Sequence, residues 1–145
     1  MGNWTIRRAE NRDADALSTC IEAAYAQYAA RISNLPPVSA DCAEGIEKYQ
    51  VWVAEVEEQV VGGLVLVPKE GFMLLANVAV HPIHMGTGLG GALLALAETE
   101  SVEQGYSELR LTTHVDMPEI IQLYAHLGWE HDYRHDNEVS MKKVI

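Results

Sequence analysis

Positively charged residues are scarce in this sequence. Its 10 Lys and Arg stand against 21 Asp and Glu, which gives a formal net charge of −11 at pH 7. Proteins bind phosphate backbones with clustered Lys and Arg, and no such cluster occurs here, so the composition argues against a nucleic-acid partner. The acidic surplus suits a cationic ligand, although a surface that only keeps the protein in solution explains it equally well.

Cysteine and long apolar runs are scarce as well. Cys20 and Cys42 are the only cysteines, they lie in segments of helical pattern, and they form no CxxC pair. We therefore expect two small buried thiols and no metal site. No apolar run approaches the roughly 20 residues that a membrane helix needs, and residues 1–12 are too polar for a leader peptide. These absences predict a soluble, cytoplasmic protein without a membrane partner.

The 145 residues contain no internal repeat and no low-complexity linker, so we expect a single domain over residues 1–145. The spacing of apolar residues predicts strands and helices in the order β α α β β β α β α β β. Strands are predicted near 4–8, 51–56, 60–67, 72–80, 109–113, 129–133 and 138–142. Helices are predicted at 13–31, from a cap at Ser39 or Asp41 to 49, from 88 to before 105, and from a capping pattern at Asp116 to before 128. This order indicates an α/β layered domain with a mixed sheet.

Three of these segments predict more specific features. Residues 51–56 and 60–67 flank a tight turn at 57–59 and are typical of a hairpin. Residues 72–80 are too apolar for simple alternation, which indicates a central strand covered on both faces. The strand, helix and strand from 72 to 113 predict a right-handed parallel crossover.

The strongest chemical signal is a glycine-rich stretch, Gly86-Thr87-Gly88-Leu89-Gly90-Gly91, between a strand and a helix. Glycines let a ligand approach the backbone, and the free amides of a first helical turn carry partial positive charge. The glycines and the free amides together predict a phosphate-binding cradle. The alternative without a ligand is a flexible loop whose glycines only allow close helix packing. A Walker A loop is excluded, because no Gly-Lys-Ser or Gly-Lys-Thr follows. A dinucleotide-binding G-x-G-x-x-G fits Gly86, Gly88 and Gly91, but it starts too far after the strand and too late in the chain.

Two motifs carry a resemblance to a known family. Val80, Pro82, Gly88 and Gly90 match a Val-x-Pro followed by Arg/Gln-x-x-Gly-x-Gly/Ala, with Met85 in place of the Arg or Gln. Residues 123–129 are similar to Leu-Tyr-x-x-x-Gly-Phe, with Trp129 at the last position. The chain thus resembles the GNAT superfamily of N-acetyltransferases. The resemblance implies a mixed, mostly antiparallel central sheet with helices on both faces, and acetyl-CoA as co-substrate without a metal.

The resemblance also implies where acetyl-CoA binds. Its pantetheine arm is expected in a gap between two splayed strands, paired with the backbone of Val78 and Val80. A backbone N–H near Val78 is then expected to hold the thioester oxygen, where negative charge develops. The cofactor-binding residues implied in this way are Val78, Ala79, Val80, Met85, Gly86, Thr87, Gly88, Leu89, Gly90 and Gly91.

The implied catalytic groups are less complete. Tyr124 occupies the place of the family's general acid, although a core aromatic is its plain interpretation. Many relatives carry a Glu on the central strand that acts as the general base, but residues 73–77 contain no carboxylate. We therefore predict a water chain relayed through His114 as the substitute. His114 also fits an ordinary strand end. Met117 replaces an Asn that many relatives carry.

The acceptor site is implied to lie against the first two helices, with Tyr25, Tyr28 and Arg31 as substrate-binding residues. Helix packing explains the two tyrosines equally well. The predicted acceptor is a small-molecule amine, cationic or not, or a peptide N-terminus. A non-catalytic acyl-CoA binding or sensing module and a small NAD-binding domain are the alternatives. Relatives are often dimers, so a homodimer and a monomer both stay open.

Overall fold

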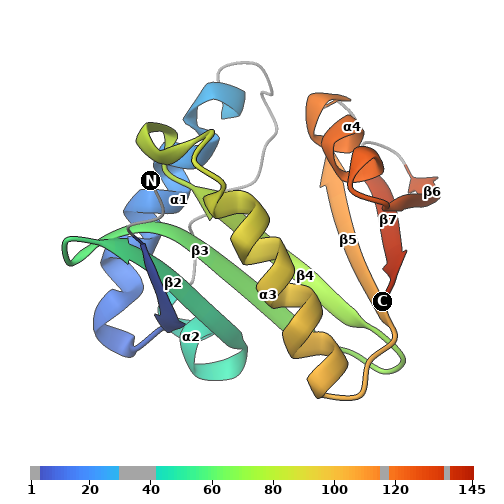
Figure 1. The fold of residues 1–145 in the computed structure, drawn as a ribbon, viewed down its shortest axis with the longest axis horizontal. Helices are drawn as coiled ribbons and strands as arrows, with labels where there is room; N and C mark the ends of the chain where they lie inside the picture. The colour runs from blue at the N-terminus through green and yellow to red at the C-terminus, as the bar shows by residue number, and fades with distance from the viewer. Residues whose placement is uncertain (1–3, 30–41, 115–117, 136–137) are drawn as a thin grey trace.

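The computed structural model describes residues 4–29, 42–114, 118–135 and 138–145. Its strands and helices follow the predicted order, with two short 3₁₀ turns added (Figure 1). The elements are β1 (Thr5–Arg8), η1 (Asn11–Asp13), α1 (Ala14–Ala29), α2 (Cys42–Lys48), β2 (Gln50–Val56), β3 (Gln59–Pro68), β4 (Met73–Val80), η2 (Pro82–His84), α3 (Leu89–Glu103), β5 (Glu108–His114), α4 (Pro118–His126), β6 (Glu130–His135) and β7 (Glu138–Val144).

The described residues form one seven-stranded sheet in the order β1-β2-β3-β4-β5-β7-β6. β4 and β5 run parallel, and the other neighbouring pairs are antiparallel. The predicted mixed, mostly antiparallel sheet, the central place of β4 and the parallel crossover are therefore confirmed. The sequence does not predict that β7 lies between β5 and β6.

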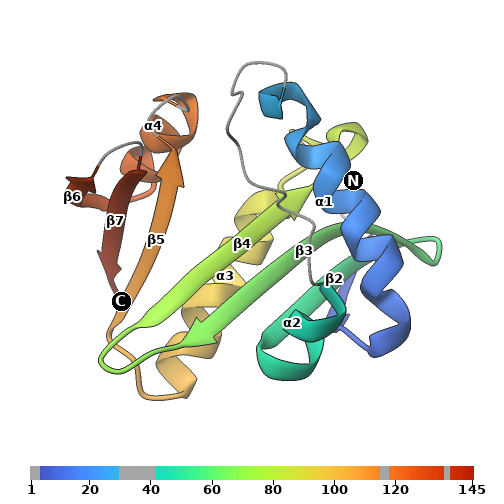
Figure 2. The same ribbon diagram turned by 180° about the vertical axis from the view of Figure 1, so that it is seen from behind.

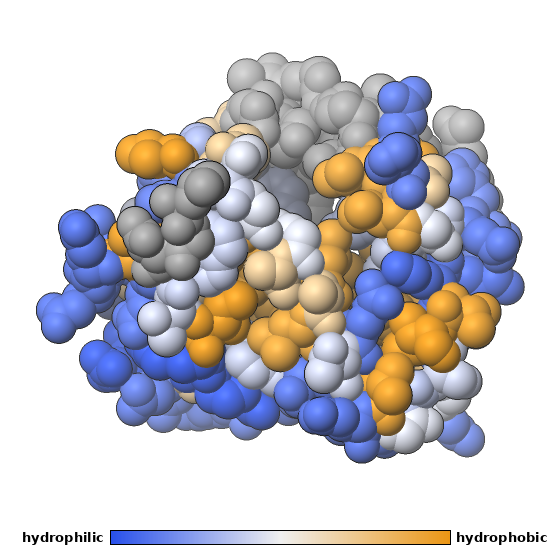
Figure 3. Space-filling model, in the orientation of Figure 1, coloured by the Kyte–Doolittle hydropathy of each residue, from blue (hydrophilic) through white to orange (hydrophobic). Residues whose placement is uncertain are grey.

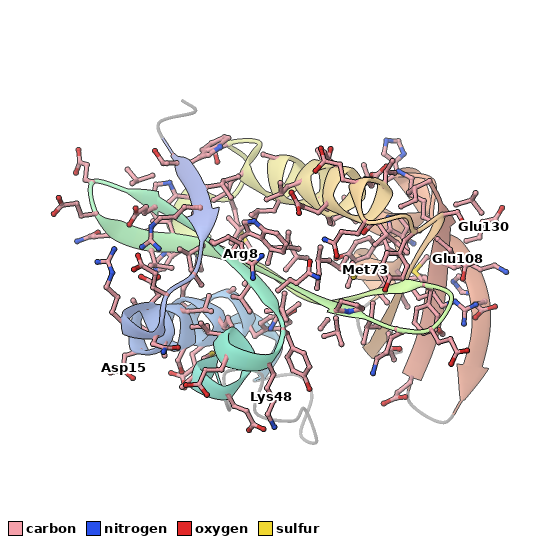
Figure 4. The ribbon with its side chains drawn as sticks, turned by 90° about the horizontal axis from the view of Figure 1, so that it is seen from below. Arg8, Asp15, Lys48, Met73, Glu108 and Glu130 are labelled. Atoms are coloured by element: carbon pink, nitrogen blue, oxygen red, sulfur yellow. The ribbon has the colours of Figure 1, made fainter. Side chains whose placement is uncertain are left out.

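Helices cover both faces of the sheet. Leu89, Leu93 and Ala97 of α3 belong to a buried cluster on one face. Leu17 and Ile21 of α1 belong to a second cluster on the opposite face. Figure 2 shows α1 and α2 on the side of the sheet away from α3, and in Figure 4 Asp15 of α1 and Lys48 of α2 lie on that same side. The chain therefore has three layers, with the sheet in the middle.

A cluster of charged side chains joins β1 and β2 to the start of α1. The Arg7 guanidinium donates to both oxygens of Asp13 at 2.8 and 2.9 Å and to Glu55 at 2.9 Å. Asp13 is only 5% exposed and also accepts from the N–H of Glu10 at 2.7 Å. The hydrogen bonds from Arg7 lower the pKa of Asp13 although burial opposes them. The cluster fixes the position of α1 relative to the sheet.

The sheet opens between β4 and β5. Within the described part of the chain, the two strands pair at Met73 with Leu109 and at Leu74 with Arg110. Figure 4 shows this closed end from below, with Met73 labelled, and Figure 1 shows the strands diverging beyond it. In β4 a β-bulge follows, because Leu66 of β3 pairs with Leu75 and Val65 pairs with Asn77, so Ala76 is left between them.

The opening corrects one prediction. Residues 72–80 were expected to be covered on both faces, but Ala76 is exposed and residues 77, 78 and 80 are only partly buried. The prediction is wrong because the second half of β4 borders a gap rather than a neighbouring strand. The apolar residues there line the gap.

The hairpin of β2 and β3 is confirmed, with a turn at Glu57 and Glu58 whose φ angles of 51° and 68° are those of a primed hairpin turn. Arg31, Ser39, Asp41, Asp116 and Met117, which belong to predicted helix ends and caps, lie outside the described residues. No helix in the described segments is long and apolar enough to span a bilayer.

Candidate active site

A cavity of about 360 Å³ occupies the gap between β4 and β5. Figure 3 shows the surface hollowed between α4 and the glycine-rich start of α3, with apolar residues on the walls. Because the strands part here, the lining includes residues from both faces of the sheet. It consists of Ala24 and Tyr25 of α1, residues 75–80 of β4, Met85, Gly90, Gly91 and Leu94 beside or in α3, Leu111 and Thr112 of β5, and Leu123, Tyr124 and Leu127 of α4.

The first turn of α3 offers unpaired backbone amides. Gly88 is the N-cap with φ of 93°, and as a glycine it has no side chain that could accept a hydrogen bond from the first-turn amides. The first N–H bonded within the helix belongs to Ala92, which donates to the Gly88 carbonyl at 3.0 Å. The three N–H groups of residues 89–91 therefore have no acceptor within the helix and mark its positive end. This arrangement suits an anion such as a phosphate.

Gly91 is a glycine that protein packing does not require. A Cβ atom built at this position meets no atom of the described residues within 4 Å, and Gly91 lines the cavity. Glycine in a helix is less stable than alanine by roughly 0.5–1 kcal/mol, so an empty space beside it asks for an explanation. A ligand that approaches the helix backbone at this point supplies one.

The backbone of β4 alternates between β3 and the gap. The N–H of His81, the residue after β4, donates to the Val61 carbonyl of β3 at 2.8 Å. Peptide groups of neighbouring residues in a strand point in opposite directions. Since residues 77–81 continue one register with β3, the N–H and C=O groups of Val78 and Val80 point toward the gap. An extended ligand chain in the cavity can therefore pair with them as a strand does.

Tyr124 of α4 closes the cavity on the β5 side. Its side chain is 8% exposed, and its ring meets the Trp129 ring edge to face at 5.4 Å and 68°. Burial raises the pKa of Tyr124, and the charge that Tyr25 acquires on ionisation raises it further. The phenol is therefore protonated at neutral pH, and the cavity holds a group that can donate a proton.

The structure brings most of the predicted site residues together. The cavity lining includes Tyr25, Val78, Ala79, Val80, Met85, Gly90, Gly91 and Tyr124. Gly86, Thr87 and Gly88 form the loop before α3, where the Thr87 hydroxyl donates to the His84 carbonyl at 2.6 Å. The Leu89 side chain is fully buried in the core, so only its backbone can meet a ligand.

Three predicted residues are not placed by the structure. Arg31 lies outside the described residues, and so do the side chains of Tyr28 and His114. The backbone of His114 ends β5, two residues after the cavity residue Thr112, and pairs with Glu138 of β7. Their roles stay predictions.

Asn77 is a site residue that the sequence reasoning missed. It lines the cavity, and its buried Oδ1 atom has no hydrogen-bond partner in the described part of the chain. The signal was present, since a lone amide in the apolar run 73–80 is unusual for a buried strand. The walls contributed by Leu94, Leu111, Thr112, Leu123 and Leu127 were also not predicted, because apolar residues of this kind look like ordinary core residues in a sequence.

Comparisons with known proteins agree with this geometry. The family model of the acetyltransferase (GNAT) domain matches residues 47–131. The uncharacterized N-acetyltransferase YjgM of Escherichia coli K12 is 36% identical over an alignment of 100 residues. The match covers 60% of this chain and 60% of YjgM, so it spans less than two thirds of that relative.

Two solved structures have the same fold. The PaiA N-acetyltransferase of Thermoplasma acidophilum, in complex with coenzyme A, has a TM-score of 0.88 at 16% identity over 98% of this chain and 99% of its own. A GNAT family acetyltransferase of Elizabethkingia anophelis with acetyl-CoA bound has a TM-score of 0.71 at 15% identity over 100% of both chains. With more than half of its residues matched by the family model, the chain belongs to the GNAT acetyltransferase family.

Proposed function

We propose that this protein is an acetyl-CoA-dependent N-acetyltransferase that moves an acetyl group onto a primary amine. The observation that carries the proposal is the cavity between β4 and β5, which joins a cradle of free amides at α3 to a buried, protonated Tyr124. An acetyl donor with a diphosphate at one end and a thioester at the other fits the two ends of this cavity.

The residues present fit coenzyme A. The amides of residues 89–91 would hold its pyrophosphate, and the missing Cβ at Gly91 leaves room for it. The gap-facing peptide groups of Val78 and Val80 would pair with the pantetheine amides. Met85 gives no charge to the phosphates, so the backbone supplies most of the binding. Coenzyme A in the Thermoplasma structure and acetyl-CoA in the Elizabethkingia structure support this choice of ligand.

Acetyl-CoA supplies a thioester carbonyl that an amine attacks and a thiolate that leaves. The N–H of Val78 would donate to the carbonyl oxygen, where negative charge develops, and one comparable donor in other enzymes is worth roughly 3 kcal/mol. Tyr124 would give its proton to the departing sulfur. Free thiols have a pKa of about 8.5, so a thiolate is a fairly good leaving group and protonation of the sulfur lowers the barrier by a modest amount.

The acceptor amine must lose a proton. An alkyl amine with a pKa of about 10.4 is neutral in only roughly one part in two thousand at pH 7. We assign the exit of that proton to a water chain beside His114, at the end of β5. Tyr25 lines the cavity from α1, and we extend the acceptor site from there to Tyr28 and Arg31, which follow it in the chain. A small amine and a peptide N-terminus both remain within the proposal.

The test combines binding with turnover. Calorimetric titration with acetyl-CoA, and with NADH as a control, measures ligand choice. Release of free thiol is then followed with benzylamine, glycinamide and spermidine as acceptors. Acetyl-CoA binding with amine-dependent thiol release supports the transferase. Binding without release favours the acyl-CoA binding module, and the absence of acetyl-CoA binding overturns the proposal.

A further inference from the structure

The side chain of Asn77 places a polar atom in an apolar wall. Among the residues that the structure describes, its buried Oδ1 has no hydrogen-bond partner, and the residue lines the cavity. Burying an unsatisfied oxygen destabilises a folded protein, and such atoms are rare in native proteins, where a catalytic role or a bound water or ion can explain them. The fold therefore retains a destabilising atom at the centre of the site.

The bulge at Ala76 decides which face of the sheet Asn77 meets. Leu75 belongs to the buried cluster under α3. Asn77 pairs with Val65, which packs in the cluster under α1, and Ala79 two residues later belongs to that same cluster. The extra residue thus turns the Asn77 side chain to the α1 face, where Ala24 and Tyr25 line the cavity. The glycine cradle of α3 lies on the opposite face.

We propose that the amide oxygen of Asn77 accepts a hydrogen bond from an N–H of the acceptor amine and positions its nitrogen beside the thioester. This inference rests on the proposed function. Asn77 is adjacent to Val78, whose N–H we assign to the thioester oxygen, and neighbouring Cα atoms in a chain lie about 3.8 Å apart. One strand would then hold both reactants, the thioester by a backbone N–H at its gap edge and the amine by the Asn77 side chain on its α1 face.

The chemistry of an amide determines what Asn77 can do. It accepts a hydrogen bond and takes no proton, so it is a positioning residue and not a base. A neutral primary amine donates one N–H to Asn77 and directs its lone pair at the carbonyl carbon. The C–N bond forms, the C–S bond breaks, sulfur receives the Tyr124 proton, and nitrogen releases one proton to water, from which the phenol is reprotonated. The acidic limb of kcat/KM for the amine should therefore follow the amine's own pKa.

Two variants test the assignment on whichever of benzylamine, glycinamide and spermidine the wild type acetylates best. Asn77→Leu keeps the branched shape of the side chain and replaces the amide oxygen and nitrogen with methyl groups. It should raise the amine KM about 10-fold, the value of one hydrogen bond, and leave the acetyl-CoA Kd unchanged. It should also raise Tm by roughly 2–4 °C, because it removes an unsatisfied buried atom. Asn77→Asp supplies a carboxylate that binds the protonated amine and should move the acidic limb to lower pH.

Val65→Ala is the matched control, since it trims the cross-strand neighbour of Asn77 and leaves the amide intact. It should lower Tm without changing the amine KM. An unchanged KM in Asn77→Leu, or an equal loss of acetyl-CoA affinity, overturns the role of Asn77 while the proposed function stands. A fall in Tm shows instead that the amide is structural. A wild type that binds acetyl-CoA but acetylates none of the three amines overturns the proposed function and this inference with it.

Discussion

The hydroxyl of Tyr124 is the atom whose removal should cost most in turnover and least in stability. Tyr124→Phe keeps the ring, which is 8% exposed and meets Trp129 edge to face at 5.4 Å, so the packing of α4 is preserved. The change removes one hydroxyl from a buried ring and keeps the ring's shape, and such volume-conserving core changes usually alter the free energy of unfolding by less than about 1.5 kcal/mol. Any large loss of activity would then come from the missing proton donor.

The expected loss follows from the proposed role of Tyr124 as proton donor. General acids contribute roughly 10²- to 10⁴-fold, and a thiolate is a good enough leaving group that the lower end applies. We expect kcat to fall about 100-fold, which corresponds to about 2.7 kcal/mol of barrier, while the acetyl-CoA Kd stays within about twofold. Burial and Tyr25 raise the pKa of Tyr124 above its ordinary value of 10.0, so wild-type kcat should show no alkaline decline from this group below about pH 10.

The assay measures thiol release at saturating acetyl-CoA, with calorimetry for Kd and a thermal melt for Tm. Tyr106→Phe is the control, because Tyr106 is partly buried against the core and does not line the cavity. If Tyr124→Phe retained kcat within about threefold of the wild type at unchanged Tm, Tyr124 would be a packing residue and the proton would reach sulfur from water.

Three further predictions concern other parts of the chain. Gly91→Ala should weaken acetyl-CoA binding at least about 10-fold in calorimetry, yet it should raise the free energy of unfolding by about 0.5–1 kcal/mol. Gly45→Ala in α2 is the control, because a Cβ there makes only an ordinary contact with Tyr49 at 3.8 Å. This control should raise the free energy of unfolding and leave the acetyl-CoA affinity unchanged. Asp13→Ala should lower the free energy of unfolding in urea by about 2–3 kcal/mol. Because Arg7 lowers the pKa of Asp13 below 3.8, the stability from this pair should be present above about pH 4 and lost as the pH falls further. The Asp13→Ala variant should not show this loss of stability. Burial raises the pKa of Cys20 to about 11, so Ellman's reagent at pH 8 should label Cys20 far more slowly in the native protein than in urea, and equal rates would contradict its burial.

The order of elements was predictable because each element carries a local pattern. Two apolar runs flanking a tight turn marked β2 and β3, and helical spacing marked α1 and α3, whose inner residues such as Leu17 and Leu93 are indeed buried. The glycine turn was predictable for a chemical reason, since four glycines beside a helix start exceed what a plain turn requires. Tyr124 followed from the family motif rather than from its own pattern.

Strand order and the two faces of β4 were not predictable in the same way. The insertion of β7 between β5 and β6 depends on pairing between distant segments, which no local period records. The bulge at Ala76 is also silent in the sequence. Most importantly, an apolar strand that lines a ligand cavity has the same composition as one that is covered by protein, so residues 72–80 were expected to be buried on both faces.

The bulge and the gap together would let one strand hold both of the proposed substrates. Beyond the bulge, the gap leaves the peptide groups of Val78 and Val80 unpaired by β5, and their side chains face α3. If Ala76 were paired with Val65 in a regular strand instead of being bulged, Asn77 would share the α3-facing side of Leu75, because side chains two residues apart lie on the same face. With the bulge, Asn77 turns to α1, opposite the glycine cradle. A single unpaired residue thus separates the side of β4 suited to a phosphate-bearing donor from the side where an acceptor can approach.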